Sequence, residues 1–442
     1  MLLVGNGKVI TRDSHQPYLH DGGVLIQDNI IVRVGSTSEL RKQCPDGLFM
    51  DAKGRVVMPG MINTHTHLYS TFARGMALKD ASPHNFQEIL KRMWWRLDKV
   101  LTLEDIHYSA MVPLVESVKN GTTTIFDHHA SPGAVRESLS VLAKASRAAG
   151  VRTCLSYEVS DRDGETVMKE GIRENVEFIR HANAEQDDMI RGMFGLHASL
   201  TLSDDTLARC CAANEGLGTG FHVHVAEAAA DVEDSLAKSG KRVVERLSGF
   251  GILGPKSIAA HCVHVNDPEI DILCETAANV IHNPESNMGN AVGCAPVLTM
   301  LRKGVTVGLG TDGYTSDMFE SLKVANVLHK HHHGDPSVAW KEAPAMLFQH
   351  NPAIATAFFP RPLGRLAPGC YADMIIVDYD PPTPLNELNA DGHVLFGMSG
   401  RAVAATIVNG RVIMEEGRVV GVDEERIHAR ARELSRSLWE RF

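Results

Sequence analysis

The stretch Arg55-Val56-Val57-Met58-Pro59-Gly60-Met61-Ile62-Asn63-Thr64-His65-Thr66-His67 is the strongest indication of fold in this chain. Its apolar first part indicates a short buried strand, and two histidines one residue apart follow where that strand ends. Because side chains at i and i+2 of a strand lie on one face, both imidazoles can point at the same spot. Two imidazoles that converge on a point are the beginning of a metal site.

The composition and net charge of the chain limit the classes of protein to which it can belong. The chain has 442 residues, of which 44% are hydrophobic and 22% are charged, as is ordinary for a globular enzyme. The net charge of −10, with no basic stretch to offset it, argues against a nucleic acid or an acidic membrane as partner. The eight cysteines are scattered without a CxxC pair, and the sequence shows neither a signal peptide nor an apolar run long enough to span a bilayer. We therefore expect a cytoplasmic protein with reduced thiols.

Short β-branched runs lie at both ends of the chain. The segments Leu2–Val4, Lys8–Ile10, Gly23–Ile26 and Ile30–Val34 are mirrored at the far end by Ala372–Asp378, Ala402–Val408 and Arg411–Met414. Asn409-Gly410, between the last two runs, is a strong hairpin signal. These strands predict one small β-sandwich domain formed from residues 1–56 and 364–418. A charged amphipathic helix is expected at Glu424–Glu440, within a C-terminal segment of residues 419–442.

Residues 57–363 are expected to form the second, larger domain, because short apolar strands alternate here with longer helical patterns such as Leu103–Lys119, Ala134–Ala149 and Glu170–Ala184. The strands are expected at Val56–Ile62, Thr122–Asp127, Val151–Tyr157, Ile190–Leu196, Thr219–Val225, Ser257–His261, Asn279–His282 and Val305–Gly310. Eight such units predict an α/β fold, a (β/α)8 TIM barrel. An open doubly wound sheet is the alternative, and it is weakened because no Gly-x-Gly-x-x-Gly follows the first strand.

Polar side chains crowd the predicted strand ends, where barrel enzymes carry their active sites. Besides His65 and His67, they are Asp127-His128-His129, Glu158, His197, His222 and His224 with Glu227, His261, His282 and Asp312. Three histidines and one aspartate suit Zn2+ or Fe2+ with a position open for water. Such an ion lowers the pKa of its bound water to about 7. Glu227, three residues after His224, could carry a proton to a substrate.

Other motifs have a simpler interpretation. His128 and His129 alternate in direction on a strand, so at most one of them faces the site easily. The tract His329 to His333 precedes Gly334-Asp335-Pro336, which favours a solvated helix C-terminus over a metal site. Trp94-Trp95 is interpreted as a packing anchor in preference to a substrate platform.

Taken together, five motifs resemble the amidohydrolase superfamily, and most of all its branch of cytosine and guanine deaminases and triazine chlorohydrolases. They are Met58-Pro59-Gly60 with His65-Thr66-His67, His224-Val225-Ala226-Glu227, Ala260-His261-Cys262, His282-Asn283-Pro284-Glu285-Ser286-Asn287 and Gly310-Thr311-Asp312. The resemblance covers nearly the whole chain. Further markers are similar to a narrower group, the SsnA family of aminohydrolases; they are Trp94–Asp98, Asp127–Pro132, Ser316–Glu320 and Pro382–Leu385.

The resemblance implies a role for individual residues. The metal ligands would be His65, His67, His224 and Asp312, and the catalytic residues would be Glu227 as proton shuttle, His261 and Asp312. The residues implied in substrate binding are His197, Arg74, Asn283, Asn287 and His128. Binuclear members carry a lysine at the end of the fourth strand, where this chain has Leu196-His197, and this favours a single metal ion.

The activity that the resemblance implies is hydrolytic removal of an amino group, as ammonia, from an aminated purine, pterin or pyrimidine. The glutamate of the HxxE element favours this deaminase activity, because a departing amine needs a delivered proton. A chlorohydrolase or cyclic amidase on the same scaffold, and a non-catalytic metal-binding scaffold, remain as alternatives. The expected partners are one divalent ion, Zn2+ or alternatively Fe2+, a small heterocyclic substrate, and further copies of the chain in a homo-oligomer.

Overall fold

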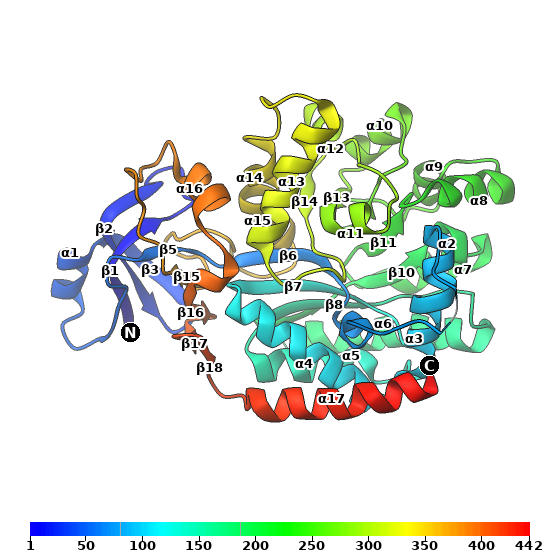
Figure 1. Cartoon of the computed structure of the whole chain (residues 1–442), viewed down its shortest axis with the longest axis horizontal. Coiled ribbons are helices and arrows are strands. Elements are labelled where there is room, and N and C mark those ends of the chain that lie inside the picture. Colours follow the sequence, from blue (N-terminus) through cyan, green and yellow to red (C-terminus); the bar gives the residue numbers. More distant parts are fainter. Residues whose placement is uncertain (80, 186) are drawn as a thin grey trace.

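The computed structural model describes residues 1–79, 81–185 and 187–442. Two sheet systems lie side by side along the long axis of the molecule (Figure 1). The smaller system is built from both ends of the chain, and the larger one is the barrel of parallel strands with helices around it. The predicted α/β fold class, a TIM barrel with a small β-sandwich domain formed from both chain ends, is thereby confirmed as a barrel with a separate sheet domain.

The terminal strands form one hydrogen-bonded sheet of nine strands. Their bounds are β1 (Leu2–Ile10), β2 (Tyr18–Gln27), β3 (Ile30–Ser36), β4 (Leu48–Asp51), β5 (Val56–Pro59), β15 (Met374–Val377), β16 (Val403–Val408), β17 (Arg411–Glu415) and β18 (Arg418–Val419). β5 of the N-terminal part pairs with β15 of the C-terminal part, and this pairing joins the two ends of the chain. The predicted hairpin is present, since β16 and β17 are antiparallel and Asn409 and Gly410 have φ of 51° and 74°.

The strand expected at Val56–Ile62 is two strands. β5 (Val56–Pro59) belongs to the terminal sheet, and β6 (Met61–Thr66) begins the barrel. The chain passes from one sheet to the other at Gly60, where a Cβ would lie only 2.1 Å from Cγ2 of Thr123. The apolar run looks continuous in the sequence because both strands are fully buried. The domain boundaries at residues 56, 363 and 418 stay predictions.

Two parallel sheets form the barrel wall, in the orders β6-β7-β8-β9 and β10-β11-β12-β13-β14. Their bounds are β6 (Met61–Thr66), β7 (Thr122–His129), β8 (Arg152–Tyr157), β9 (Ile190–Gly192), β10 (Phe194–Ala198), β11 (Phe221–Val225), β12 (Ile258–His261), β13 (Asn279–His282) and β14 (Val307–Leu309). Bridges between Thr66 and Asp312 and between Val159 and Leu196 connect the two sheets at both seams. Because β9 and β10 are successive pieces of one strand, this closure gives an eight-stranded barrel and excludes the open sheet.

Helices surround the barrel wall and cover part of its mouth. They are α2 (Phe86–Ile89), α3 (Trp95–Val100), α4 (Leu103–Lys119), α5 (Ser138–Ala149), α6 (Glu165–Glu185), α7 (Asp204–Asn214), α8 (Ala229–Ser239), α9 (Val243–Gly249), α10 (Asp267–Glu275), α11 (Pro284–Gly289), α12 (Val297–Arg302), α13 (Met318–His333), α14 (Glu342–Ala345) and α15 (Asn351–Thr356). Short turns η1 (Leu68–Ala73), η2 (Leu90–Trp94), η3 (Ser199–Thr201) and η4 (Met346–His350) connect some of them. α1 (Thr37–Gln43), α16 (Ala390–Gly397) and η5 (Gly400–Ala402) accompany the terminal sheet.

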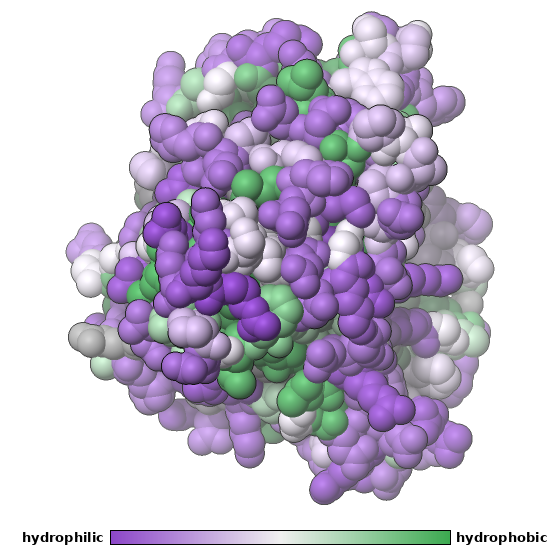
Figure 2. Space-filling model, turned by 90° about the vertical axis from the view of Figure 1, so that its left-hand side faces the viewer, coloured by the Kyte–Doolittle hydropathy of each residue, from purple (hydrophilic) through white to green (hydrophobic). Residues whose placement is uncertain are grey.

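The C-terminal helix α17 (Glu424–Arg441) runs along the outside of α4 and ends beside α3 (Figure 1). Among the helices that the structure describes, none combines the length and the apolar character that crossing a bilayer requires. Figure 2 looks onto the end of the molecule that the terminal sheet forms, and most of that face is hydrophilic. The core therefore lies inside the barrel layers and beneath the sheet, where Val24, Ile26, Ile31 and Ile376 are buried.

Candidate metal centre and substrate cavity

The predicted polar side chains meet at the carboxyl ends of the barrel strands. His65 is the penultimate residue of β6, His224 lies on β11, His261 ends β12, and Asp312 follows β14. His261 and Asp312 have φ of 72° and 52°, a left-handed conformation that residues other than glycine rarely adopt. The strand ends thus hold strained backbone where these side chains turn into the barrel mouth, as is typical of functional sites.

His67 and His224 face each other with their Nε2 atoms 3.2 Å apart. In each ring Nδ1 donates to a carbonyl, that of His128 at 2.5 Å for His67 and that of His197 at 2.8 Å for His224. A carbonyl oxygen can only accept, so the proton of each neutral ring is on Nδ1 and each Nε2 carries a lone pair. Two lone pairs at this separation repel unless a positive charge, a proton or a metal cation, lies with them.

The carboxylate of Asp312 supplies a negative charge beside these imidazole nitrogens. Its Oδ1 lies 3.1 Å from Nε2 of His67 and 3.9 Å from Nε2 of His65. Burial alone would lower the pKa of His67, but Asp312 and Glu158 raise it to about 9. Burial alone would also raise the pKa of Asp312, but the contact with His67 holds it well below its usual range. The site therefore favours a positive charge between these side chains.

His65 is the third histidine of the cluster. Its Nε2 is buried and has no hydrogen-bond partner among the described residues, while Nδ1 lies 2.8 Å from Nε2 of His222. His222 therefore supports His65 through a hydrogen bond and does not point into the open mouth. Burial, followed by the charge of neighbouring histidines, lowers the pKa of His222 to about 3, so this ring stays neutral.

The donor set fits a divalent cation. His65, His67 and Asp312 form one group of possible ligand atoms lying within 4.8 Å of one another, and His65, His224 and His261 form a second. Nitrogen from three imidazoles with one carboxylate oxygen is a set that Zn2+ accepts, with tetrahedral geometry and room for a further ligand. A bound cation would provide a partner for the unpaired Nε2 of His65. It would also remove the repulsion between the facing lone pairs of His67 and His224.

Glu227 and His261 stand beside this cluster. Oε2 of Glu227 lies 3.5 Å from Nε2 of His261, and that same nitrogen is 3.9 Å from Oδ2 of Asp312. Nδ1 of His261 lies 2.9 Å from Oδ1 of Asn287, which accepts its proton and leaves Nε2 free. Burial, and then the charge of Asp312, raises the pKa of Glu227 well above its usual range.

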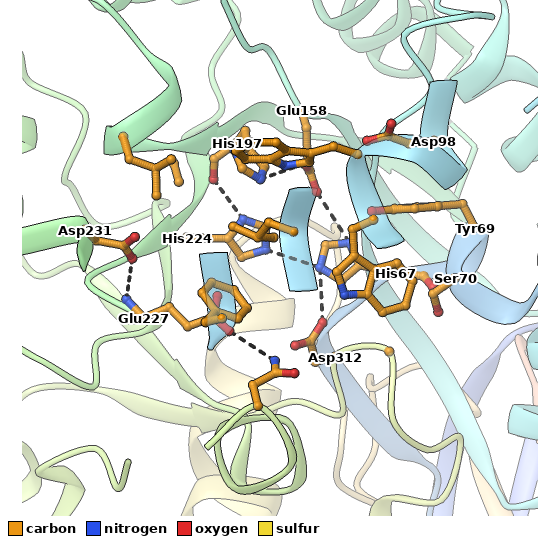
Figure 3. A pocket seen from close by; sticks show the side chains of 18 of the residues that line it. His67, Tyr69, Ser70, Asp98, Glu158, His197, His224, Glu227, Asp231 and Asp312 are labelled. Atoms are coloured by element: carbon orange, nitrogen blue, oxygen red, sulfur yellow. Dashed lines mark hydrogen bonds and ion pairs between the residues drawn. The ribbon is translucent and has the colours of Figure 1, made fainter. Parts of the chain in front are cut away.

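A cavity opens directly above the cluster (Figure 3). His67, His224, Glu227 and Asp312 form its polar floor. The other lining residues are Tyr69, Ser70, Phe86, Leu90, Trp94, Trp95, Asp98, Glu158, His197, Ala198, Leu200, Asp231, Asn290, Gly313 and Tyr314. The wall mixes aromatic and aliphatic side chains with a few polar groups, and this combination is the usual form of a small-molecule site.

Two carboxyl groups of the wall, those of Glu158 and Asp98, have no role that the sequence motifs indicate. Burial raises the pKa of Glu158 to about 7 and that of Asp98 to about 6. Asp98 pairs with Arg162, and Glu158 lies 3.4 Å from Nδ1 of His67. The place of Glu158 at a strand end was the available signal for it, whereas Asp98 lies in a helical segment whose position over the barrel no strand pattern reveals.

Four of the predicted substrate contacts do not line this cavity, and their role in substrate binding stays a prediction. Arg74 is exposed and pairs with Glu116 at 2.6 Å, outside this cavity. His128 is fully buried behind His67 and stacks on His222. Asn283 and Asn287 are buried as well; Asn287 bonds His261, and Asn283 lies 3.5 Å from the same ring. Of the five predicted contacts, His197 is the one that lines the cavity described above.

Trp94 and Trp95 line the cavity, and the ring of Trp95 lies 6.2 Å from that of His197; their interpretation as packing anchors stays a prediction. His329 is buried against His282, with ring centroids 5.0 Å apart, although the expected solvated helix end is correct for His331, His332 and His333. The helical period places His329 on the inner face of α13, which the run of histidines obscures.

Residues 56–413 match the amidohydrolase family. The chain belongs to this family. It is 34% identical over 445 residues to a 5′-deoxyadenosine deaminase of Methanosarcina mazei, covering 99% of this chain and 98% of the relative. It is 33% identical to a 5-methylthioadenosine/S-adenosylhomocysteine deaminase of Pelotomaculum thermopropionicum, covering 97% of each. In structure, this amidohydrolase resembles an adenosine deaminase from Xanthomonas campestris with bound zinc, at a TM-score of 0.87, 22% identity and coverage of 99% and 98%.

These likenesses confirm the predicted enzyme class. This amidohydrolase is a hydrolytic deaminase that acts on a C–N bond of an aminated heterocycle, and the deaminase branch of the superfamily is correct. The narrower resemblance to SsnA, the cytoplasmic location and the homo-oligomeric state stay predictions from the sequence.

Proposed function

We propose that His65, His67, His224 and Asp312 bind one divalent metal ion, with Zn2+ as the resident metal and Fe2+ as the alternative. The observation that carries the proposal is the 3.2 Å approach of the Nε2 atoms of His67 and His224 next to the Asp312 carboxylate. His197, where binuclear members carry a lysine, supports a single ion. When bound, such an ion supplies a Lewis acid that makes a water molecule acidic enough to ionise near neutral pH.

The protein's own residues would then move the protons. Asp312 would accept the first proton of the water, and Ser286, whose hydroxyl donates to Oδ2, would orient that carboxylate. Glu227 would protonate a ring nitrogen of the substrate and so make the neighbouring carbon electrophilic. His261, with Nε2 free for a hydrogen bond, would hold the added oxygen.

The proposed reaction conserves every atom and every proton. The carbon–oxygen bond forms, Asp312 passes its proton to the amino group, and the carbon–nitrogen bond breaks to release ammonia. The proton of the added hydroxyl then returns to Glu227, while the ring nitrogen keeps the proton that Glu227 gave. One water is consumed, and a carbonyl compound and ammonia are formed.

For the substrate we propose an aminopurine nucleoside, with 5′-deoxyadenosine as the first compound to test. Support comes from the two relatives named for deamination of adenosine derivatives, which match nearly the full length of this chain. The aromatic wall formed by Tyr69, Trp94 and Trp95 provides flat apolar surfaces against which a purine ring can pack.

The experiment is a screen for released ammonia with metal analysis of the same purified sample. The panel contains 5′-deoxyadenosine, adenosine, guanine, a pterin and cytosine, with Glu227→Gln as the blank. Ammonia from a purine nucleoside with about one metal ion per chain supports the proposal. Turnover of the free bases or the pterin alone would contradict the nucleoside assignment, and full activity of metal-free protein would contradict the metal site.

A further inference from the structure

The last turn of α17 contacts the two segments that form one wall of the cavity. Nε1 of Trp439 donates to the carbonyl of Phe72 at 2.7 Å. Nη2 of Arg96 donates to the main-chain oxygen of Phe442 at 2.7 Å, and the Arg96 guanidinium lies 4.2 Å above the Phe442 ring. Phe72 belongs to η1 and Arg96 to α3, so the end of the chain touches both segments at once.

These two segments supply cavity residues immediately beside the contacts. η1 contributes Tyr69 and Ser70, and α3 contributes Trp95 and Asp98. η1 starts directly after His67, where the amide of Leu68 donates to the Asp127 carboxylate at 2.7 Å. The wall is thus fixed to the barrel at the start of η1, and the contact with Trp439 lies at the opposite end of this short turn.

The rest of α17 is attached to a different element. Ile427, Ala431, Leu434 and Leu438 are its buried residues, and the helix packs mainly on α4. Arg430 pairs with Glu104 of α4 at 2.7 Å. Because this apolar face and ion pair dock the helix on α4, the bonds of its last turn to η1 and α3 are not needed for docking. Their effect falls on the cavity wall.

We propose that Trp439 and Phe442 are positioning residues that hold the η1 and α3 wall against the substrate. The proposal rests on the proposed function only in taking the cavity for the substrate site. Loss of one neutral hydrogen bond typically weakens an interaction by about three- to tenfold. A displaced wall should therefore raise KM by that factor and leave kcat nearly unchanged, since neither residue reaches the reacting groups.

The test compares three variants of the metal-loaded protein. Trp439→Phe removes the indole N–H and keeps an aromatic ring at this position. Trp340→Phe makes the same change at an exposed tryptophan whose Nε1 donates to the Pro336 carbonyl at 2.9 Å, away from the cavity. Arg430→Gln breaks the ion pair between α17 and α4 but leaves the last turn intact.

Hydrogen–deuterium exchange and steady-state kinetics with 5′-deoxyadenosine give the readouts. We expect faster exchange over residues 68–100 and a three- to tenfold higher KM in Trp439→Phe alone, with kcat within about twofold, metal content unchanged and Tm unchanged. Unchanged exchange in this segment, a loss of metal, or the same change in Arg430→Gln would overturn the proposal. If wild-type protein does not turn over 5′-deoxyadenosine, the substrate assignment fails, and the exchange comparison still decides the role of Trp439.

Discussion

The imidazole rings of His128 and His222 stack 4.3 Å apart and only 6° from parallel, directly behind the ligand cluster. Both rings are fully or almost fully buried. Nε2 of His222 lies 2.8 Å from Nδ1 of His65 and so supports that ring. The cluster is therefore two layers deep, with His65, His67 and His224 around the proposed ion and two further histidines that fix their orientation. Such outer partners typically contribute about 10- to 100-fold in metal affinity or activity.

The same substitution at the two histidines of β11, His222 and His224, should therefore have different effects on metal binding. We expect His224→Gln to lose the metal ion and essentially all activity, because it removes a ligand. His222→Gln should retain metal but bind it about 10- to 100-fold more weakly, since only the support of His65 is altered. Competition with a chromophoric chelator measures both affinities, and equal loss in the two variants would contradict the assignment of His224 as ligand and His222 as support.

Glu227→Gln should retain the metal and lower kcat by about 100- to 10,000-fold, the usual range for a lost general acid–base group. Glu285→Gln is the matched control, because it is the same chemical change in a buried carboxyl group that does not line the cavity. Ammonia release at saturating 5′-deoxyadenosine, with metal content measured in parallel, is the readout. Near wild-type turnover by Glu227→Gln would refute its role in proton transfer.

Asn287→Ala should slow the reaction without removing the metal. Oδ1 of Asn287 fixes the proton of His261 on Nδ1, and without this acceptor the ring can take the other tautomer and block Nε2. We expect kcat to fall about 10- to 100-fold. Asn287→Asp keeps an acceptor at this position and should recover part of the rate; a rate as low as that of the alanine variant would argue against control of the tautomer.

Glu285 predicts a pH dependence of stability that is independent of the metal site. Burial raises its pKa from 4.5 to about 7. The folded state therefore holds more protons than the unfolded state between these values, and this residue makes stability fall as pH rises from about 4.5 to 7. Glu285→Gln should remove that loss and stabilise the protein at pH 8 by about 2 to 3 kcal/mol, with little effect at pH 4.5. Urea unfolding at both pH values measures this, and equal stability of variant and wild type at pH 8 would contradict it.

The barrel and its polar strand ends could be predicted because both follow from local rules. Alternating strand and helix patterns indicate parallel pairing, and residues at strand ends such as His65, His224 and Asp312 then share one edge. The hairpin at Asn409 and Gly410 is local as well. The first predicted strand is divided at Gly60 into β5 and β6. The sequence could not predict this division because both strands are apolar and buried.

The cavity wall could not be predicted for a different reason. Trp94, Trp95 and Asp98 lie in a segment that covers the barrel mouth, and its position depends on contacts with residues distant in the chain. Trp439 is the extreme case, because its partner Phe72 is 367 positions away. The role of Arg74 in substrate binding stays a prediction; its guanidinium pairs with Glu116, a contact that no spacing in the sequence reveals.

The proposed metal site requires four side chains that are far apart in the chain to bind one ion. Anomalous diffraction at the zinc edge from crystals of metal-loaded protein would locate that ion. We predict a single strong peak, with His65, His67, His224 and Asp312 each contributing an atom within about 2.0–2.2 Å. A peak that His224 or Asp312 does not reach, or a peak at the His331 to His333 surface with none at the barrel mouth, would contradict the account.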